Sequence, residues 1–394
     1  MKQNTTYKQT ELGLIPEDWE VNRFTDIAEL IHGFQFREEH FAENGRFGVI
    51  KIGNLTYQGN ISLDYLSKTD CDKINNYERL FLKRGDILMA LTGGTLGKMS
   101  IFNLEEHKYL QNYRVGKFEP NEKTIKNYIY YLLSSNYVQK RIEDNVNEAA
   151  QPNFGKQDFD KIKIPLPPLP EQKKIADCLS TWDIAIEKQS ALINALTDRK
   201  KALMQQLLTG KKRLPGFSEE WKEVKLGSLC KVTTGKLDAN AMVENGIYRF
   251  YTCAKDYYLI NEYKFDTEAL LISGNGANVG YIHYYKGKFN AYQRTYVLDK
   301  FKEDIFFIKY FLDYFLSQRI SNEKKEGNTP YIVLSTLTEM SIKLPSLSEQ
   351  TAIAEILATA DSELQLQKEK LAQLQTQKKG LMQVLLTGKK RLMN

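Results

Sequence analysis

Apolar side chains recur at alternating intervals of four and three residues in two long stretches of the chain. The positions in the first stretch are Ile175, Leu179, Trp182, Ile186, Gln189, Ile193, Leu196, Lys200, Leu203 and Leu207. Those in the second are Ile353, Leu357, Ala360, Leu364, Gln367, Leu371, Leu374, Lys378, Leu381 and Leu385. Only the Gln and Lys of each stretch are polar, and such a spacing kept over this length is typical of a coiled-coil seam. We therefore predict two long antiparallel helices that pair with each other.

The expected ends of the helices agree with this pattern. Prolines 167, 168 and 170 should block a helix before residue 171, and Ser348 is the candidate N-cap of the second helix. Gly210 and Gly388 are natural left-handed stops. Each helix is then about 40 residues, or roughly 60 Å, long.

The polar seam positions occupy equivalent places in both helices, where a polar residue can fix register and partner. The alternative is two surface helices that each pack on their own domain. The pattern disfavours it, because such helices carry a wider apolar stripe and are usually much shorter.

The helices belong to an internal repeat. Residues 200–214 and 378–392 differ at only two of fifteen positions, Ala202 against Gly380 and Gln206 against Val384. Segment 19–33 also aligns with 221–235, at a different offset. One structural unit therefore occurs twice, and the first globular part is the longer of the two.

Aromatic residues separate the globular parts from the helices. Every tyrosine and phenylalanine lies outside 171–213 and 349–392. Apolar runs predict strands at 49–52, 87–91, 99–102 and 113–118, then a helix at 124–145 and a strand at 161–164. In the second half they predict strands at 248–251, 269–272, 281–285 and 295–298, then a helix at 304–324 and a strand at 341–344. Each part should open with a Trp-containing strand and a short helix.

These elements predict an α+β fold with a pseudo-two-fold internal repeat, in which two globular mixed α/β domains are joined by the two antiparallel coiled-coil helices. The expected boundaries are 1–165 for the first domain, 166–212 for the central helix, 213–345 for the second domain and 346–394 for the distal helix.

Composition adds few constraints. The net charge of +6 permits nucleic-acid binding, but Lys and Arg nearly balance Asp and Glu within 1–165 and 216–345. The four cysteines are scattered and the histidines show no metal-ligand spacing, which favours a reduced, cytoplasmic protein without a metal site. The N-terminal sequence lacks the apolar core of a signal peptide.

Three segments approach catalytic motifs without matching them. The glycines of 93–98 are one residue too close for a phosphate loop, and Met99 stands where Ser or Thr should bind magnesium. Segment 274–280 misses the dinucleotide fingerprint. Segment 151–154 has the residues of an amino-methyltransferase motif in the wrong order, so we interpret it as a structural turn. No catalytic residue is predicted.

The repeated segments resemble the specificity subunit of Type I restriction–modification enzymes. The residues that carry the resemblance are LPPLPEQ at 166–172, its echo LPSLSEQ at 344–350, LLTGKKRL at 207–214 and 385–392, and IPEDW at 15–19. The resemblance covers the whole chain. It implies that each globular domain is a target-recognition domain reading one half of an asymmetric, bipartite double-stranded DNA site, while the helices set the unread spacer.

The resemblance also implies the partners. Two modification subunits, which bind S-adenosylmethionine and methylate adenine, would dock on the helices, and restriction subunits that hydrolyse ATP with magnesium would join them. No cofactor is expected in this chain. The alternatives are a coiled-coil scaffold without DNA specificity and the recognition part of a fused restriction–methylation enzyme.

Base reading requires long polar side chains on loops that reach the major groove. In the first domain the candidate DNA-binding residues are Gln35, Arg37, Asn54, Thr56, Tyr57, Gln58, Thr92, Thr95, Lys98, Asn112 and Arg114. In the second they are Lys236, Asn240, Lys255, Asp256, Tyr257, Asn275, Asn278 and Arg294. Each could instead be a solvated loop residue or a turn-forming Asn. The basic runs 211–213 and 389–391 repeat in both halves, so we assign them to framework and partner roles.

Overall fold

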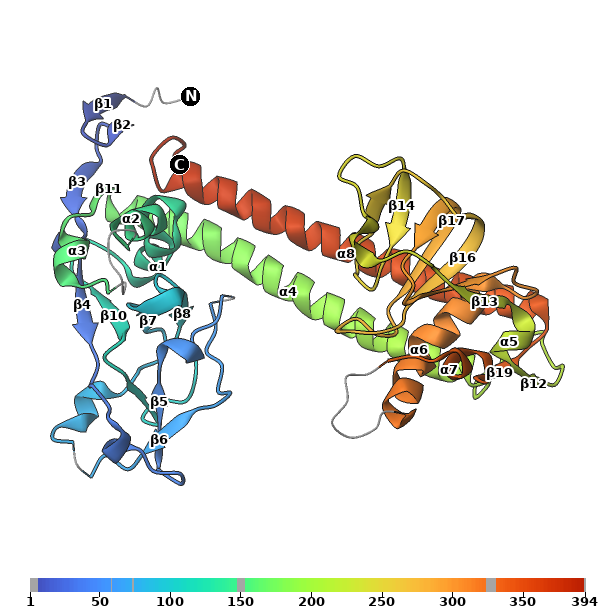
Figure 1. Cartoon of the computed structure of the whole chain (residues 1–394). Helices are drawn as coiled ribbons and strands as arrows, with labels where there is room; N and C mark the ends of the chain where they lie inside the picture. Colours follow the sequence, from blue (N-terminus) through green and yellow to red (C-terminus); the bar gives the residue numbers. More distant parts are fainter. Residues whose placement is uncertain (1–5, 58, 73, 147–152, 324–330, 393–394) are drawn as a thin grey trace. The chain divides into compact units, whose positions relative to one another are not determined.

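The computed structural model describes residues 6–57, 59–72, 74–146, 153–323 and 331–392. They pack as two compact units: unit 1 is Met1–Lys188 with Leu371–Asn394, and unit 2 is Gln189–Lys370. Both long helices are therefore divided between the units, whereas the expected boundaries set the helices apart from the globular parts. Figure 1 labels the elements of each unit.

Unit 1 combines small sheets, antiparallel except for the pair β5-β9, with short helices. Its strands are β1 (Tyr7–Thr10), β2 (Gly13–Pro16), β3 (Glu20–Arg23), β4 (Ala28–His32), β5 (Phe47–Ile50), β6 (Ser67–Thr69), β7 (Ile87–Ala90), β8 (Met99–Ile101), β9 (Tyr109–Gln111), β10 (Val115–Pro120) and β11 (Lys163–Leu166). Its short helices are α1 (Lys126–Ser134), α2 (Asn136–Val146) and α3 (Lys156–Asp160). The strands form a β4-β10-β7-β8 sheet, a β6-β5-β9 sheet and the pairs β1-β2 and β11-β3.

Unit 2 has one larger sheet in the order β13-β18-β16-β17-β14-β15, with β12-β19 as a separate pair. Its strands are β12 (Lys222–Lys225), β13 (Lys231–Thr234), β14 (Tyr248–Tyr251), β15 (Tyr258–Ile260), β16 (Phe265–Ser273), β17 (Ile282–Ala291), β18 (Thr295–Asp299) and β19 (Ser341–Leu344). Its short helices are α5 (Leu226–Leu229), α6 (Ile305–Glu323) and α7 (Leu334–Thr338). The continuous strand β17 pairs with both β16 and β14. In unit 1 the equivalent pairings are divided between β8, which pairs with β7, and β9, which pairs with β5.

The two long helices are α4 (Leu169–Leu208) and α8 (Leu347–Leu385), and each contributes to the core of both units. In unit 1 the apolar core includes Ile175 and Leu179 of α4 together with Leu385 of α8. In unit 2 the corresponding core includes Leu207 of α4 and Ile353 of α8. These residues all belong to the four-three pattern, and neighbours outside it, such as Ala176 and Leu208, lie in the same cores.

Side-chain pairs within each unit show that the helices run antiparallel. In unit 2, Gln189 Nε2 donates to Gln367 Oε1 at 2.8 Å, and Lys200 forms an ion pair with Asp361. As the residue number rises along α4, that of its partner on α8 falls, so the two helices run in opposite directions. In unit 1, Lys378 pairs with Asp183 in the equivalent way. Both polar positions of the seam thus have partners on the other helix.

The helix starts differ from the sequence expectation. Helix α4 begins at Leu169 and includes Pro170, because a proline in the first turn lacks only an N–H that would have no intrahelical acceptor. Ser348 lies inside the first turn of α8 and is not its N-cap. The stops are as predicted, since Gly210 and Gly388 adopt φ of +70° and +71°.

The helix expected at 124–145 is broken. Ser135 adopts an extended conformation (φ −71°, ψ 147°) that ends α1, and its hydroxyl accepts a hydrogen bond from the Val138 amide at 3.3 Å in the first turn of α2. The helix expected at 304–324 is continuous as α6. Strands β16 and β17 extend beyond the runs predicted for them and pair with each other from Phe265–Phe289 to Ile272–Ile282. Among the described residues, no helix is long and apolar enough to cross a membrane.

Candidate nucleic-acid interface

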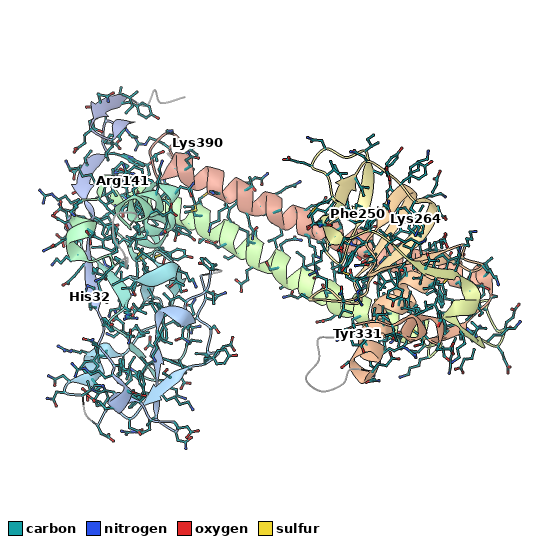
Figure 2. The ribbon with its side chains drawn as sticks, in the orientation of Figure 1. His32, Arg141, Phe250, Lys264, Tyr331 and Lys390 are labelled. Carbon is teal, nitrogen blue, oxygen red and sulfur yellow. The ribbon has the colours of Figure 1, made fainter. Side chains whose placement is uncertain are left out.

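Four segments of unit 1 meet at one end of its central sheet, and we call this region the loop edge of unit 1. The loop after β4 bridges the turn before β10, with Tyr113 N donating to Phe34 O at 2.9 Å. The glycine turn after β7 joins them, since Leu91 N donates to Arg114 O at 2.9 Å. The fourth segment pairs with the glycine turn through the bridge between Thr92 and Asn153. His32, labelled in Figure 2, marks the end of β4.

The loop around residues 53–60 lies beside this edge. Ile101 N on β8 donates to Gly59 O at 2.9 Å, which fixes the loop against the sheet. Lys98 Nζ lies 4.3 Å from the centroid of the Tyr57 ring, and that ring is 80% exposed. A cation on an exposed aromatic ring offers both stacking and a positive charge to a ligand.

Unit 2 has an equivalent loop edge built by the same backbone pairings. Leu237 bridges Tyr292 after β13, as Phe34 bridges Asn112 in unit 1. Gly274 N donates to Arg294 O at 2.8 Å, and Asn275 bridges Tyr331. Tyr331 is labelled in Figure 2.

A glycine is required at the same place in both edges. A Cβ on Gly33 would lie 2.1 Å from Gln111 O, and a Cβ on Gly235 would lie 1.8 Å from Ala291 O. The loop backbone therefore contacts the neighbouring strand directly, which only glycine allows.

The loop at 253–257 is attached to the edge of unit 2. Asn278 Nδ2 donates to Cys253 O at 3.0 Å, and His283 Nε2 lies 3.0 Å from Ala254 O. Burial lowers the pKa of His283, so its imidazole is neutral and donates through Nε2. This anchoring leaves the following residues Lys255, Asp256 and Tyr257 exposed.

The sequence candidates fall into three groups by exposure. Those with exposed side chains are Gln35, Arg37, Tyr57, Arg114, Lys236, Asn240, Lys255, Asp256, Tyr257 and Arg294. Those that are half-buried are Thr56, Thr92, Thr95, Lys98, Asn275 and Asn278. Asn54 and Asn112 are buried. Gln58 lies outside the described residues.

Some of these side chains already serve the backbone of their own turns. Asn54 Oδ1 accepts from Lys51 N at 3.0 Å and its amide donates to Ser62 O at 3.0 Å. Asn112 Oδ1 accepts from Arg114 N at 3.1 Å, and Thr56 Oγ1 donates to Asn60 O at 3.0 Å. Their structural role is turn formation, so the exposed cations and amides carry the prediction of base contact.

Sequence reasoning missed Arg249 of β14 and His283 and Tyr285 of β17, which lie next to the anchored loop of unit 2. These three residues lie within strands, whereas base contacts were predicted on loops. A signal was present in the alternation of Arg249 with Tyr251, because residues two apart on a strand share a face.

The repeated basic runs have a structural role in both units. Arg391 Nε donates to Glu171 Oε1 at 3.0 Å, and Trp19 Nε1 donates to Glu171 Oε2 at 2.9 Å. The hydrogen bond to Glu171 raises the pKa of Arg391, while Arg391 lowers the pKa of nearby Asp18. We call Arg391, Glu171 and Trp19 the clamp of unit 1.

The clamp of unit 2 consists of Arg213, Glu349 and Trp221. Arg213 Nε and Nη2 each donate to the Glu349 carboxylate at 2.8 Å, and Trp221 Nε1 donates to it at 3.3 Å. Residues kept identical between the halves therefore hold the framework. Lys211, Lys212, Lys389 and Lys390 are exposed on the same runs.

Residues 16–198 and 218–376 match the family described as Type I restriction modification DNA specificity domain. The chain belongs to this family. Its two matched ranges coincide with the two halves of the repeat.

Specificity subunits of Type I restriction enzymes are among its relatives. The EcoDI subunit of Escherichia coli is 45% identical over 171 residues, covering 43% of this chain and 37% of the relative. The MjaVIII subunit of Methanocaldococcus jannaschii is 35% identical over 220 residues, covering 55% and 51%. The chain therefore spans about half the length of these two relatives or less. The putative MjaX subunit of the same organism is 28% identical over 415 residues, covering 98% of this chain and 97% of the relative.

Solved structures of this family share the fold. The S subunit of a Type I restriction–modification system from M. genitalium superposes with a TM-score of 0.61 at 18% identity, covering 98% of this chain and 97% of that chain. A chain from a study of complex assembly in the type I R-M system superposes with a TM-score of 0.62 at 17% identity, covering 95% and 99%.

Proposed function

We propose that this chain is the DNA-recognition subunit of a Type I restriction–modification complex, in which each unit reads one half of an asymmetric bipartite site. The observation that carries the proposal is the contrast between repeated and unrepeated parts. The clamps and the backbone pairings of the loop edges are the same in both units, while most of the side chains presented by those edges differ, with Arg114 and Arg294 as an exception. Two different half-sites read from one framework require this arrangement.

The chemistry of the loop edges suits DNA. Exposed Arg and Lys side chains such as Arg37, Arg114 and Arg294 can bind guanine or phosphate. Exposed amides such as Gln35 and Asn240 can bind adenine. These are neutral-to-basic surfaces on loops held by a rigid sheet, which is how base-reading side chains are positioned.

The long helices act as the spacer. Helix α4 has 40 residues and α8 has 39, and a paired helix holds a separation better than a flexible linker does. Deleting matched turns from both helices should shorten the gap between the half-sites. An unchanged gap in a methylation-protection assay would contradict the spacer role.

The remaining activities belong to partners. Two modification subunits would supply S-adenosylmethionine-dependent adenine methylation after docking on the helices, and restriction subunits would supply ATP- and magnesium-dependent cleavage. This chain itself is non-catalytic and acts with its partners in the cytoplasm. The exposed repeated lysines 211, 212, 389 and 390 are candidates for the docking contacts.

The decisive experiment is methylome sequencing of a host that expresses this chain with its modification subunit. We expect one asymmetric motif with two specific parts separated by unread base pairs. A gel shift with site-bearing and random duplexes, using the assembled complex, supplies the control. Equal binding to both duplexes, with no motif in the methylome, would identify the chain as a scaffold without DNA specificity.

A further inference from the structure

One cation of unit 2 is enclosed by aromatic rings at the margin of the loop edge. The guanidinium carbon of Arg249 lies 4.3 Å from the centroid of the Tyr257 ring and 4.5 Å from that of Tyr285. Arg249 Nη1 also donates to the Tyr251 hydroxyl at 3.4 Å. Phe250, labelled in Figure 2, marks the strand β14 that carries it. Contacts with two rings and a hydroxyl hold the guanidinium plane in one orientation.

This cation has no acidic partner. Several other arginines are paired with carboxylates, as Arg46 is with Asp70 and Asp72. Over the residues that the structure describes, no Asp or Glu lies within ion-pair distance of Arg249, which is only half exposed. A half-buried, permanently charged guanidinium without a carboxylate retains free N–H donors for an external acceptor.

The surroundings connect Arg249 to the loop edge of unit 2. Strand β14 runs directly into the anchored loop at 253–257, where Cys253 Sγ lies 3.5 Å from Arg294 O. Tyr285 belongs to β17, which also carries His283, the residue that holds Ala254. The exposed rings of Tyr257 (46%) and Tyr281 (39%) border the same region.

The equivalent position of unit 1 has no side chain. Strand β5 pairs in parallel with β9 as β14 pairs with β17, so that Ile50 lies opposite Gln111 and Tyr251 lies opposite Ala291. Because Gly33 and Gly235 contact Gln111 and Ala291 respectively, the position that matches Arg249 is Gly48. Arg249 is therefore not part of the shared framework.

We propose that Arg249 is a specificity-determining residue, which reads a guanine in the half-site bound by unit 2. The contacts with Tyr257, Tyr285 and the Tyr251 hydroxyl leave other guanidinium N–H donors for an external acceptor, and two such donors match the O6 and N7 acceptors of guanine in the major groove. The proposal rests on the proposed function, since it assumes that unit 2 binds one half-site. The proposal assigns base reading to a strand residue, whereas base contacts were expected from loops alone.

The test uses the complex of the full chain with its modification subunit, and compares methylomes for wild type, Arg249→Lys and Arg249→Met. With Arg249→Met we expect one guanine position in one half-site to become degenerate, with discrimination reduced by roughly 10- to 100-fold, while the other half-site is unchanged. Arg249→Lys keeps the charge and should retain a weaker preference for guanine. Arg46→Met is the matched control, because Arg46 also lies over an aromatic ring, Phe47 at 5.3 Å, and should leave the motif unchanged.

Three results would overturn the role of Arg249: an unchanged motif, a change in both half-sites, or an equal loss at every position of one half-site, which indicates a phosphate contact. If Arg249→Met abolishes methylation, competition binding between duplexes altered at single base pairs measures the same discrimination, and equal losses for all duplexes count against the proposal. A wild-type chain that yields no bipartite motif would instead refute the proposed function.

Discussion

The clamps and the loop edges differ in how much of each region is repeated between the two units. In the clamps, residues more than a hundred positions apart make the same bonds twice, with Arg391 and Arg213 holding Glu171 and Glu349. In the loop edges the backbone bonds repeat while most side chains do not, as with Asn153 and Tyr331, although Arg114 and Arg294 are the same in both. The difference shows that this fold separates the scaffold, whose residues must complement one another, from a surface whose residues complement something outside the chain.

The largest loss of stability is expected from changes in the clamps. Replacing Arg391 by Met leaves the carboxylate of Glu171, only 7% exposed, without its cation. We expect unit 1 to lose about 3 kcal/mol or more, because an uncompensated buried charge is costly. Hydrogen exchange of the core of unit 1 measures the loss.

The matched changes are Arg213→Met and Lys390→Met. Arg213→Met leaves the carboxylate of Glu349, only 1% exposed, without its cation, so it should cost about as much, with the loss confined to unit 2. Lys390 is exposed and its substitution should stay within about 0.5 kcal/mol. Loss of protection in both units from either arginine change would contradict two independent clamps.

The coiled-coil seam offers the next largest effect. Gln189→Leu removes the amide that bonds to Gln367, leaving a polar group in the seam without its partner. We expect a cost of about 1–2 kcal/mol, most of it recovered in the double variant with Gln367→Leu. Denaturant unfolding of the four members of the cycle tests this, with exposed Gln205→Leu as the control. A double-variant cost equal to the sum of the two single-variant costs would show that the pair contributes nothing specific.

A smaller effect is expected at a position where the units differ inside their cores. Tyr131 and Tyr310 donate to Asp183 and Asp361 in the same way, so Tyr128 corresponds to Phe307. The Tyr128 hydroxyl is buried without a hydrogen-bond partner among the described residues. Tyr128→Phe should therefore be neutral or stabilising by up to about 1 kcal/mol, whereas Phe307→Tyr should destabilise. Thermal unfolding of both variants measures these changes in stability. A loss of stability from Tyr128→Phe would show that the hydroxyl has a hydrogen-bond partner.

The smallest effect concerns pH. Arg391 lowers the pKa of Asp18, so this ion pair stabilises unit 1 above the unfolded-state pKa of about 3.9 and ceases to do so as pH falls through the lowered folded-state pKa. Because the side chain of Asp18 is 50% exposed, solvent screening should limit the contribution to less than about 0.5 kcal/mol. Unfolding of wild type and Asp18→Asn between pH 2 and 7 should differ only at the upper end. A difference that persists at pH 2 would have another cause.

Sequence reasoning recovered the features that depend on local periodicity. The four-three seam and the glycine stops at 210 and 388 follow from the geometry of a single helix, and the structure has them. The duplicated segments also indicated correctly which residues belong to the framework. Arg213 and Arg391 are the same residue type in both halves, and so are the glutamates that they bind.

Features that depend on contacts between distant segments could not be predicted. The break at Ser135 arises because its hydroxyl and extended backbone suit the junction of α1 and α2, and the apolar pattern continues across it. The position of Arg249 depends on the parallel pairing of β14 with β17, which brings Tyr285 against it. The loop candidates remain predictions, since exposure alone does not distinguish a base reader from a solvated side chain.

The split composition of unit 1 affects the order in which the chain can fold as it is synthesised. Residues of unit 2 form one continuous segment, Gln189–Lys370, whereas unit 1 includes Leu371–Asn394. Leu385 and Leu386 are fully enclosed in the core of unit 1. Unit 1, whose larger part is translated first, must therefore wait for Leu385 and Leu386 to leave the ribosome, while unit 2 can complete its core earlier. Until then the apolar surface of Ile175 and Leu179 is left for chaperones to shield.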